Sequence, residues 1–208
     1  MLCDNKDYLD TIELGRRVNN VIDKGIVHEE SLDKHRKDAL KLYRKQKPTR
    51  DLTQVELRAW QRELQTVIET PTDREIIWVI GLKGNEGKTW YQDYLVSLHG
   101  YTRVVRLDLK LNTQNVLYIL SKRPLCTTDI FLFNERRAPN NETCNYTILE
   151  SIKDGVAVSS KYSSDILQFK VPNVVIVFSN HRPSAKQLSK DRWKIILKDG
   201  LKAVTKAV

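Results

Sequence analysis

The chain has 208 residues, of which 40% are hydrophobic and 29% are charged, enough for one packed domain with an extension. Its formal net charge of +9 favours a polyanionic partner such as nucleic acid, although a protein that is merely basic is an equal alternative. No apolar run reaches transmembrane length, no signal peptide opens the chain, and no cysteines or histidines are spaced as a zinc site. These features argue against a membrane protein and favour an intracellular protein with reduced thiols.

Residues 1–70 predict a basic helical extension. Apolar residues at helical spacing predict a first helix that ends at Gly25, although Gly15 within it weakens the prediction. A second helix, rich in lysine and arginine, is expected from about His28 to Gln46, and Pro48 ends it. Its basic face either contacts DNA or is simply solvated.

A third helix is expected from Thr53, where TQVE reads as a capping box, to Pro71. After Pro71 the sequence changes from charged helical segments to apolar strand-like runs. We therefore take Pro71 as the boundary between the extension and an α/β domain at 71–208.

Apolar strands alternate with helices from Arg74 onward. The strands are expected at residues 76–80, 104–109, 129–134 and 171–180. Helices are expected at residues 88–98, 113–122 and 145–155, and alternating residues predict a hairpin at 156–170. Strands that alternate with helices imply an α/β fold, with a parallel sheet flanked by helices on both faces.

The stretch GLKGNEGKTW, residues 81–90, connects the first of these strands to a helix. It ends in Gly-Lys-Thr like a phosphate-binding loop, but Leu82 stands where the usual pattern has its first glycine. If Gly81 opens the loop and Gly84 turns it, the loop is one residue longer than usual. The residues expected to bind ATP are Gly81, Gly84, Asn85, Glu86, Gly87, Lys88 and Thr89.

Each part of this loop has a chemical task. Backbone N–H groups surround the phosphates, and the dipole of the following helix adds positive potential. The Lys88 ammonium can reach the β- and γ-phosphates, and the Thr89 hydroxyl can ligate Mg²⁺. The alternative is a strand–turn–helix connection with a chance Gly-Lys-Thr, which the buried strand before the loop disfavours.

A second polar pair, Asn134 and Glu135, follows the strand DIFLFN. A P-loop NTPase needs an acid at the end of a neighbouring buried strand, where it holds Mg²⁺ or activates water. Asn134 offers an uncharged carbonyl oxygen, so we expect weaker Mg²⁺ binding, whereas Glu135 can polarise the attacking water. The alternative is a core strand that ends in a polar turn.

Together, these motifs resemble the helicase portion of the replication-associated (Rep) proteins of small circular single-stranded DNA viruses, nearest to the nanovirus and alphasatellite type. The resemblance runs from about Leu57 to Gly200 and includes IIWVIGLKGNEGKTW, NYTILESIKDGVAVSSKY, VVIVFSN and LSKDRW in matching order. It implies a superfamily 3 helicase with a P-loop AAA+ type fold. The longer phosphate loop is similar to that family's own loop.

The resemblance assigns further roles. Asn180, at the end of VVIVFSN, is similar to the polar sensor residue that orients the attacking water, and otherwise caps the next turn. Arg192, in LSKDRW, is similar to the arginine finger that reaches a neighbouring subunit's nucleotide, and otherwise pairs with Asp191 on the surface.

A DNA-contacting loop is also implied by the resemblance. Lys161, at the turn of the predicted hairpin, is similar to the lysine that grips the DNA backbone in the channel of a ring. Ser160 adds a neutral hydrogen bond to phosphate, and Lys153 is expected nearby. The alternative for a lysine at a hairpin tip is plain solvent exposure.

Two features depart from the family. Asn134 stands where the family has an aspartate, which puts hydrolysis in question but leaves nucleotide binding possible. Full-length members also begin with a nicking endonuclease that needs a paired-histidine motif and a Tyr-x-x-Lys motif. Neither motif occurs in this sequence, so we expect no nicking activity.

The leading hypothesis is therefore an ATP- and Mg²⁺-dependent helicase module that forms a homo-oligomer, expected to be a hexameric ring, on single-stranded DNA. Residues 1–70 would link and assemble the subunits. A nucleotide-gated DNA-binding or assembly module without useful hydrolysis is the main alternative, and a small P-loop kinase is a third. The nucleus is the expected location in a eukaryotic host, and the cytoplasm otherwise.

Overall fold

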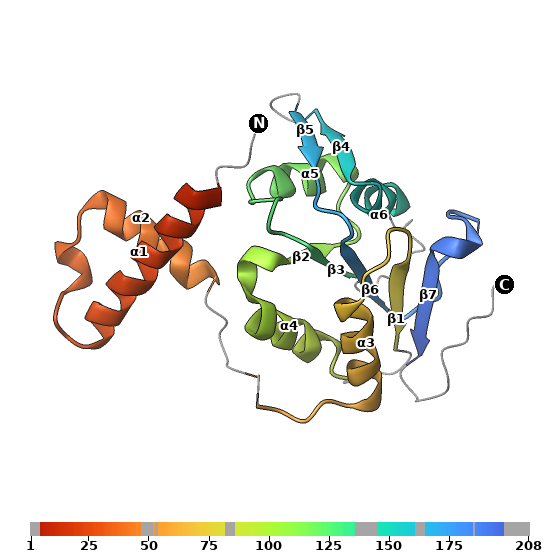
Figure 1. Ribbon diagram of the computed structural model, residues 1–208, viewed down its shortest axis with the longest axis horizontal. Helices are drawn as coiled ribbons and strands as arrows, with labels where there is room; N and C mark the ends of the chain where they lie inside the picture. Colours follow the sequence, from red (N-terminus) through yellow and green to blue (C-terminus); the bar gives the residue numbers. More distant parts are fainter. Residues whose placement is uncertain are drawn as a thin grey trace.

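The computed structural model describes residues 5–46, 52, 54–81, 86–135, 145–160, 165–184 and 186–197 (Figure 1). Its centre is a five-stranded sheet with the strand order β2–β3–β6–β1–β7, in which all pairs are parallel. The strands are β1 (Ile76–Ile80), β2 (Val104–Asp108), β3 (Ile130–Asn134), β6 (Val174–Ser179) and β7 (Trp193–Leu197). The expected α/β fold with a parallel sheet is confirmed. No helix in the described ranges combines the length and the apolarity that crossing a bilayer requires.

Helices cover both faces of the sheet. They are α3 (Ala59–Glu69), α4 (Lys88–Arg103), α5 (Thr113–Ser121) and α6 (Tyr146–Lys153). One face packs against α3 and α4 through a cluster that includes Trp60, Leu64 and Leu95. The other face packs against α5 and α6 through a cluster that includes Leu117 and Ile148. Every residue of β1 and β6 is buried, as expected for central strands that are covered on both sides.

The expected hairpin is present as β4 (Val156–Ser159) paired antiparallel with β5 (Asp165–Gln168). It packs through Ala157 and Leu167 onto the α5–α6 face and lies at the top of the molecule in Figure 1. The residues between the two strands lie outside the described part of the chain.

Two boundaries differ from the expectation. The third helix begins at Ala59 rather than at Thr53, and the Arg58 N–H donates to Oε1 of Gln61 at 2.9 Å at its start. Thr53 itself lies outside the described residues. Since α3 buries its apolar face against the sheet, it belongs to the α/β unit, and the unit begins before α3 rather than at Pro71.

Strand β7 was not expected from the sequence. It adds to β1 as an edge strand, with Trp78 opposite Ile195. Among its five residues only Ile196 is fully buried. A strand with such partial burial gives neither a continuous apolar run nor a clear alternation, because its outer edge faces solvent.

The N-terminal helices form a hairpin with a core of its own. Helix α1 (Asn5–Asp23) and helix α2 (Lys34–Gln46) follow the expected order, with a short 3-10 turn between them. Val18, Leu32 and Leu40 are buried between them. Gly15 lies inside α1 because the two helices touch there: a Cβ at this position would lie 2.2 Å from the Ala39 carbonyl oxygen.

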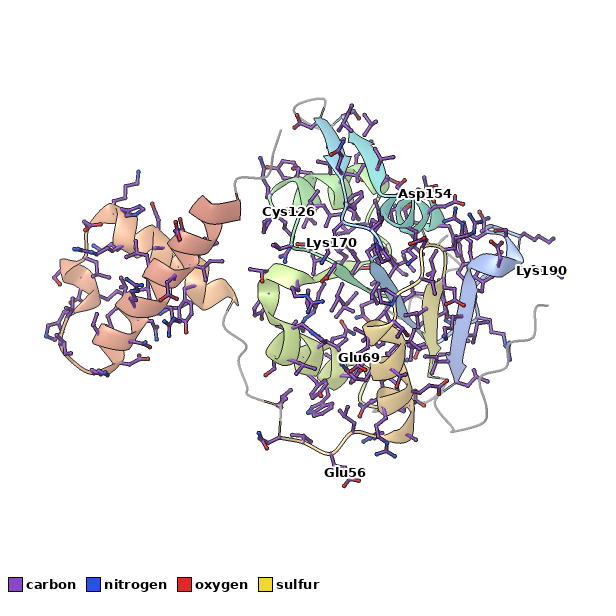
Figure 2. All side chains as sticks on the ribbon, in the orientation of Figure 1. Glu56, Glu69, Cys126, Asp154, Lys170 and Lys190 are labelled. Atoms are coloured by element: carbon purple, nitrogen blue, oxygen red, sulfur yellow. The ribbon has the colours of Figure 1, made fainter. Side chains whose placement is uncertain are left out.

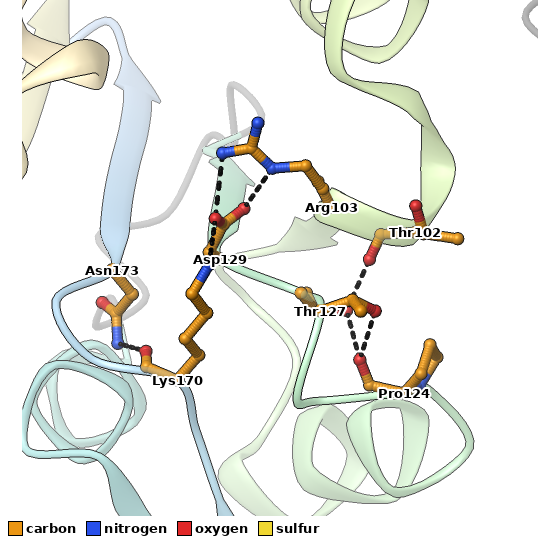
Figure 3. A network of polar contacts seen from close by, with 8 residues as sticks. Thr102, Arg103, Pro124, Thr127, Asp129, Lys170 and Asn173 are labelled. Carbon is orange, nitrogen blue, oxygen red and sulfur yellow. Dashed lines mark hydrogen bonds and ion pairs between the residues drawn. The ribbon is translucent and has the colours of Figure 1, made fainter. Parts of the chain in front are cut away.

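The edge of the sheet where the strands begin is held by charged side chains (Figure 3). Asp129, directly before β3, accepts two hydrogen bonds from Arg103, at 3.0 and 2.9 Å, and one from Lys170 at 3.0 Å. The Asp129 side chain is 10% exposed, whereas Arg103 and Lys170 are 47% and 49% exposed, so solvent screens these pairs in part. This edge therefore forms a fixed base for the sheet.

We predict that Gly15→Ala lowers the free energy of unfolding of the α1–α2 hairpin by about 2 kcal/mol, because the new methyl group forces the helices apart. This is the net loss, since the clash costs about 3 kcal/mol and alanine's higher helix propensity returns about 1 kcal/mol. Hydrogen exchange of the amides in residues 5–46 would measure the change. The matched control is Asn20→Ala on the exposed face of α1, and equal protection in both variants would contradict the prediction.

Candidate nucleotide-binding site

The carboxyl ends of β1, β3 and β6 meet at one edge of the sheet. The Gly81 N–H donates to the Ser179 carbonyl oxygen at 3.0 Å. The Glu135 N–H donates to the Phe178 carbonyl oxygen at 2.9 Å. Asn180 follows directly after β6. The parallel pairing thus brings the residues that end three separate strands, Gly81, Glu135 and Asn180, to one place.

Lys88, the first residue of α4, lies at this edge and is hydrogen-bonded to residues of two strand ends. Its ammonium donates to the carbonyl oxygens of Gly81 at 3.0 Å and Ser179 at 2.9 Å, and to Oδ1 of Asn180 at 2.6 Å. The lysine of the loop and the expected sensor residue are therefore in direct contact. Charge-assisted hydrogen bonds of this kind are stronger than neutral ones.

The described part of the loop explains why glycine stands at position 81. A Cβ on Gly81 would lie 1.7 Å from Oε2 of Glu86 and 3.0 Å from the Lys88 ammonium. The Glu86 side chain is buried and covers the Gly81 Cα atom. Gly81 thus permits a close approach of the loop to the strand. Gly84 and Asn85 lie outside the described residues and stay predictions.

Gly87 precedes α4 with a φ of 80°, a left-handed conformation that favours glycine. The carbonyl oxygen of Glu86, just before it, accepts a hydrogen bond from Nη1 of Arg58 at 3.1 Å. The start of α3 thereby supports the loop at the N-terminus of α4, where backbone N–H groups without helical partners favour an anion.

Glu135 is oriented by a residue that the sequence analysis did not single out. The Ser179 hydroxyl donates to Oε2 of Glu135, and the His181 N–H donates to that hydroxyl oxygen at 2.8 Å. Ser179 is fully buried at the end of β6. The signal that could have revealed it is a polar residue directly before Asn180 in an otherwise apolar strand.

The expected metal ligands Thr89, Asn134 and Glu135 contain one carboxylate. Thr89 is exposed in the first turn of α4, and Asn134 is half-buried at the end of β3. Within the described ranges, His, Cys, Asp and Glu side chains form no group of three or more that could hold a metal by itself. A hydroxyl, an amide oxygen and one carboxylate fit Mg²⁺ that is held mainly by phosphate oxygens and water.

Arg192 does not present its guanidinium at the surface. It lies in a short 3-10 turn before β7, its side chain is 8% exposed, and Nη2 lies 2.9 Å from Oδ1 of Asp154. Glu150 is a second partner at 3.6 Å, and Asp154 is labelled at the end of α6 in Figure 2. Asp191, the alternative partner, pairs with Arg74 instead at 2.6 Å. An arginine finger would have to leave Asp154 and Glu150 to reach another subunit, so that role stays a prediction, and the contacts within this chain do not favour it.

Lys153 is also turned inward, so its expected contact with DNA is withdrawn. Its ammonium donates to the carbonyl oxygens of Thr72 at 2.7 Å and Asn173 at 2.6 Å, at the edge opposite the nucleotide site. Burial lowers the pKa of Lys153 to about 8. Ser160 is exposed at the end of β4, and its N–H donates to Oε1 of Gln114 at 2.8 Å. Lys161 lies outside the described residues.

Sequence comparison finds relatives among viral and satellite replication proteins. The chain is 36% identical over 145 residues to Para-Rep C10 of Milk vetch dwarf C10 alphasatellite, covering 68% of this chain and 48% of that protein. It is 32% identical over 143 residues to the master replication protein of Subterranean clover stunt virus (strain F), covering 69% and 46%. This chain is Rep-like.

The Rep-like chain spans about half the length of the relatives that it matches. No family model matches its sequence. Among solved structures, NtrX from Brucella abortus matches with a TM-score of 0.37 and 15% identity, covering 81% of this chain and 42% of that one, which is too weak to support an argument.

We predict that Lys153→Met lowers the free energy of unfolding by about 2 kcal/mol, because two buried carbonyl oxygens lose their shared donor. The matched control is Lys190→Met, which removes an exposed lysine and leaves stability unchanged. Urea unfolding monitored by circular dichroism would compare the two variants, and equal midpoints would contradict the prediction.

The lowered pKa of Lys153 gives this comparison a pH dependence. Between about pH 8 and the model-peptide value of 10.5, the unfolded chain binds more protons at this site than the folded chain does. The wild type should therefore gain stability relative to Lys153→Met as pH rises through this window, by at most about 1.4 kcal/mol per pH unit. Parallel stability curves would show that the folded-state pKa is not lowered.

We predict that Arg192→Met lowers the free energy of unfolding of the single chain by about 1–3 kcal/mol, because a partly buried charge-assisted hydrogen bond to Asp154 is lost. The control is Arg182→Met, which changes an exposed arginine. Urea unfolding at a concentration where the protein is monomeric measures the effect. Unchanged stability would show that the contact with Asp154 does not stabilise the single chain.

Proposed function

We propose that the α/β unit is the ATP-dependent DNA helicase module of a Rep-like replication protein. The observation that carries this proposal is the 2.6 Å contact between the Lys88 ammonium and Oδ1 of Asn180. It joins the loop lysine to a polar residue at the end of the central strand β6, beside the N-terminus of α4. A strand–turn–helix connection with a chance Gly-Lys-Thr would not require this contact.

The residues at this edge support binding and hydrolysis of a nucleoside triphosphate. When bound, ATP with Mg²⁺ supplies the phosphoryl group and a cation that neutralises its charge. Lys88 can exchange its protein acceptors for phosphate oxygens, which releases the amide oxygen of Asn180 to hold a water molecule. Glu135, oriented by the Ser179 hydroxyl, can accept the proton of that water. Binding of the phosphates and positioning of the water are thereby linked through Lys88.

Single-stranded DNA and further copies of the chain are the proposed partners. Relatives of this chain are named master replication proteins, and the net charge of +9 favours a polyanion. Exposed Ser160 directly follows β4, and Lys161, the residue after it in the sequence, lies outside the described residues and stays the expected DNA contact. In a homo-oligomeric ring, the β4–β5 hairpins could contact the DNA backbone without reading its sequence.

A second candidate function is a nucleotide-gated DNA-binding or assembly module without useful hydrolysis. Asn134 favours it, because the strand that should supply a negatively charged Mg²⁺ ligand ends in a neutral amide. Nucleotide binding through Lys88 would persist in such a module, while turnover would be slow.

We predict that the wild type hydrolyses ATP, that Asn134→Asp raises the rate about tenfold or more, and that Lys88→Ala abolishes it. The charged carboxylate holds Mg²⁺ more firmly, whereas loss of the ammonium removes a phosphate ligand. Phosphate release with and without single-stranded DNA measures all three proteins.

The two candidate functions give different results in this assay. The helicase module requires measurable turnover by the wild type and stimulation by single-stranded DNA. Undetectable turnover by the wild type, combined with turnover by Asn134→Asp, would support the binding module instead. In a separate calorimetric titration, ATP binding by Lys88→Ala as tight as that of the wild type would rule out both.

A further inference from the structure

We propose that a pocket next to the phosphate loop binds the base of the nucleotide, which gives this chain a base-recognition subsite formed by α3 and α4. The pocket has a volume of about 340 Å³. It is lined by Val55, Glu56, Arg58, Gln61, Gly87 and Trp90. The proposal deepens the proposed function and rests on phosphate binding at Lys88.

The position of the pocket follows from Gly87. This residue lines the pocket and is also the cap that precedes α4, next to Lys88. Phosphates at the N-terminus of α4 would therefore place the attached nucleoside within reach of the pocket. Its volume falls in the range of about 300–1,000 Å³ that is typical of small-molecule sites.

Trp90 offers an aromatic surface for a base. Its ring is half-buried and stacks on Tyr94 at a centroid distance of 5.8 Å. Tyr94 stacks in turn on Tyr91 at 5.6 Å, and Tyr91 contacts Trp60 of α3 at 5.3 Å. This row of rings holds Trp90 in place before a ligand arrives, which lowers the entropic cost of stacking a base on it. Base–aromatic stacking tolerates different bases, because every base has a π-face.

Arg58 links the pocket to the loop. Arg58 lines the pocket, and its guanidinium donates to the carbonyl oxygen of Glu86 at 3.1 Å. Since a guanidinium also stacks on planar rings, Arg58 can contact a base while it supports the loop that holds the phosphates. Glu56, which also lines the pocket, lies on the segment before α3 (Figure 2).

Two probes that differ only in the nucleoside test the proposal: ATP and inorganic tripolyphosphate. Calorimetric titration of the full chain would give the affinity for each, in the wild type, Trp90→Ala and Trp90→Phe. We expect the wild type to bind ATP at least about tenfold more tightly than tripolyphosphate. Trp90→Ala should lose this preference without weaker tripolyphosphate binding, and Trp90→Phe should keep most of it because a ring remains.

A second variant fills the pocket without changing the aromatic row. Val55 is 45% exposed on a turn, so Val55→Trp is tolerated by the fold and occupies the space of the base. It should also remove the preference for ATP while tripolyphosphate binding stays unchanged. Urea midpoints equal to that of the wild type confirm that each variant is folded, and Lys88→Ala, which should weaken both probes, serves as the reference.

The outcomes separate the pocket from the phosphate site. Equal affinity of the wild type for both probes, or an ATP preference that survives in Trp90→Ala and Val55→Trp, overturns the base pocket and leaves the phosphate site intact. Failure of the wild type to bind either probe overturns the phosphate site, and the base pocket with it.

Discussion

The candidate site depends on the hydrogen bonds that the ammonium of Lys88 donates. This ammonium is bonded to the ends of β1 and β6 and to Asn180, so it joins the loop, the sheet and the expected sensor. A cation held by three oxygen atoms can exchange them for phosphate oxygens without losing its hydrogen bonds.

The two edges of the sheet are built differently. At the edge where the strands begin, Asp129 and Lys153 are buried and bonded to neighbouring segments, which fixes the start of β3 and ties Thr72 to Asn173. At the opposite edge, the polar groups of Lys88 and Glu135 are bonded to residues that end the strands. In a parallel sheet, ligands bind at this second edge, and a rigid opposite edge keeps the strand ends in register.

The direction in which long basic side chains turn was the feature least predictable from the sequence. Arg192 and Lys153 were expected at a subunit interface and on DNA, but both turn into the protein. A sequence shows that a residue carries charge, and not which way its flexible side chain turns. Arg192 pairs with Asp154, and Lys153 pairs with Asn173. Both pairs form only because α6 packs beside the segments that carry Arg192 and Asn173.

The sequence by itself predicted the α/β class, four of the five sheet strands, the loop with Lys88, Asn134 at the end of β3 and Asn180 after β6, because buried strands and phosphate loops have local patterns. The tertiary structure decided the rest: edge strand β7, the assignment of α3 to the α/β unit, the Ser179–Glu135 contact and the pocket between Arg58 and Trp90. These depend on contacts between residues far apart in the chain, and no local pattern records such contacts.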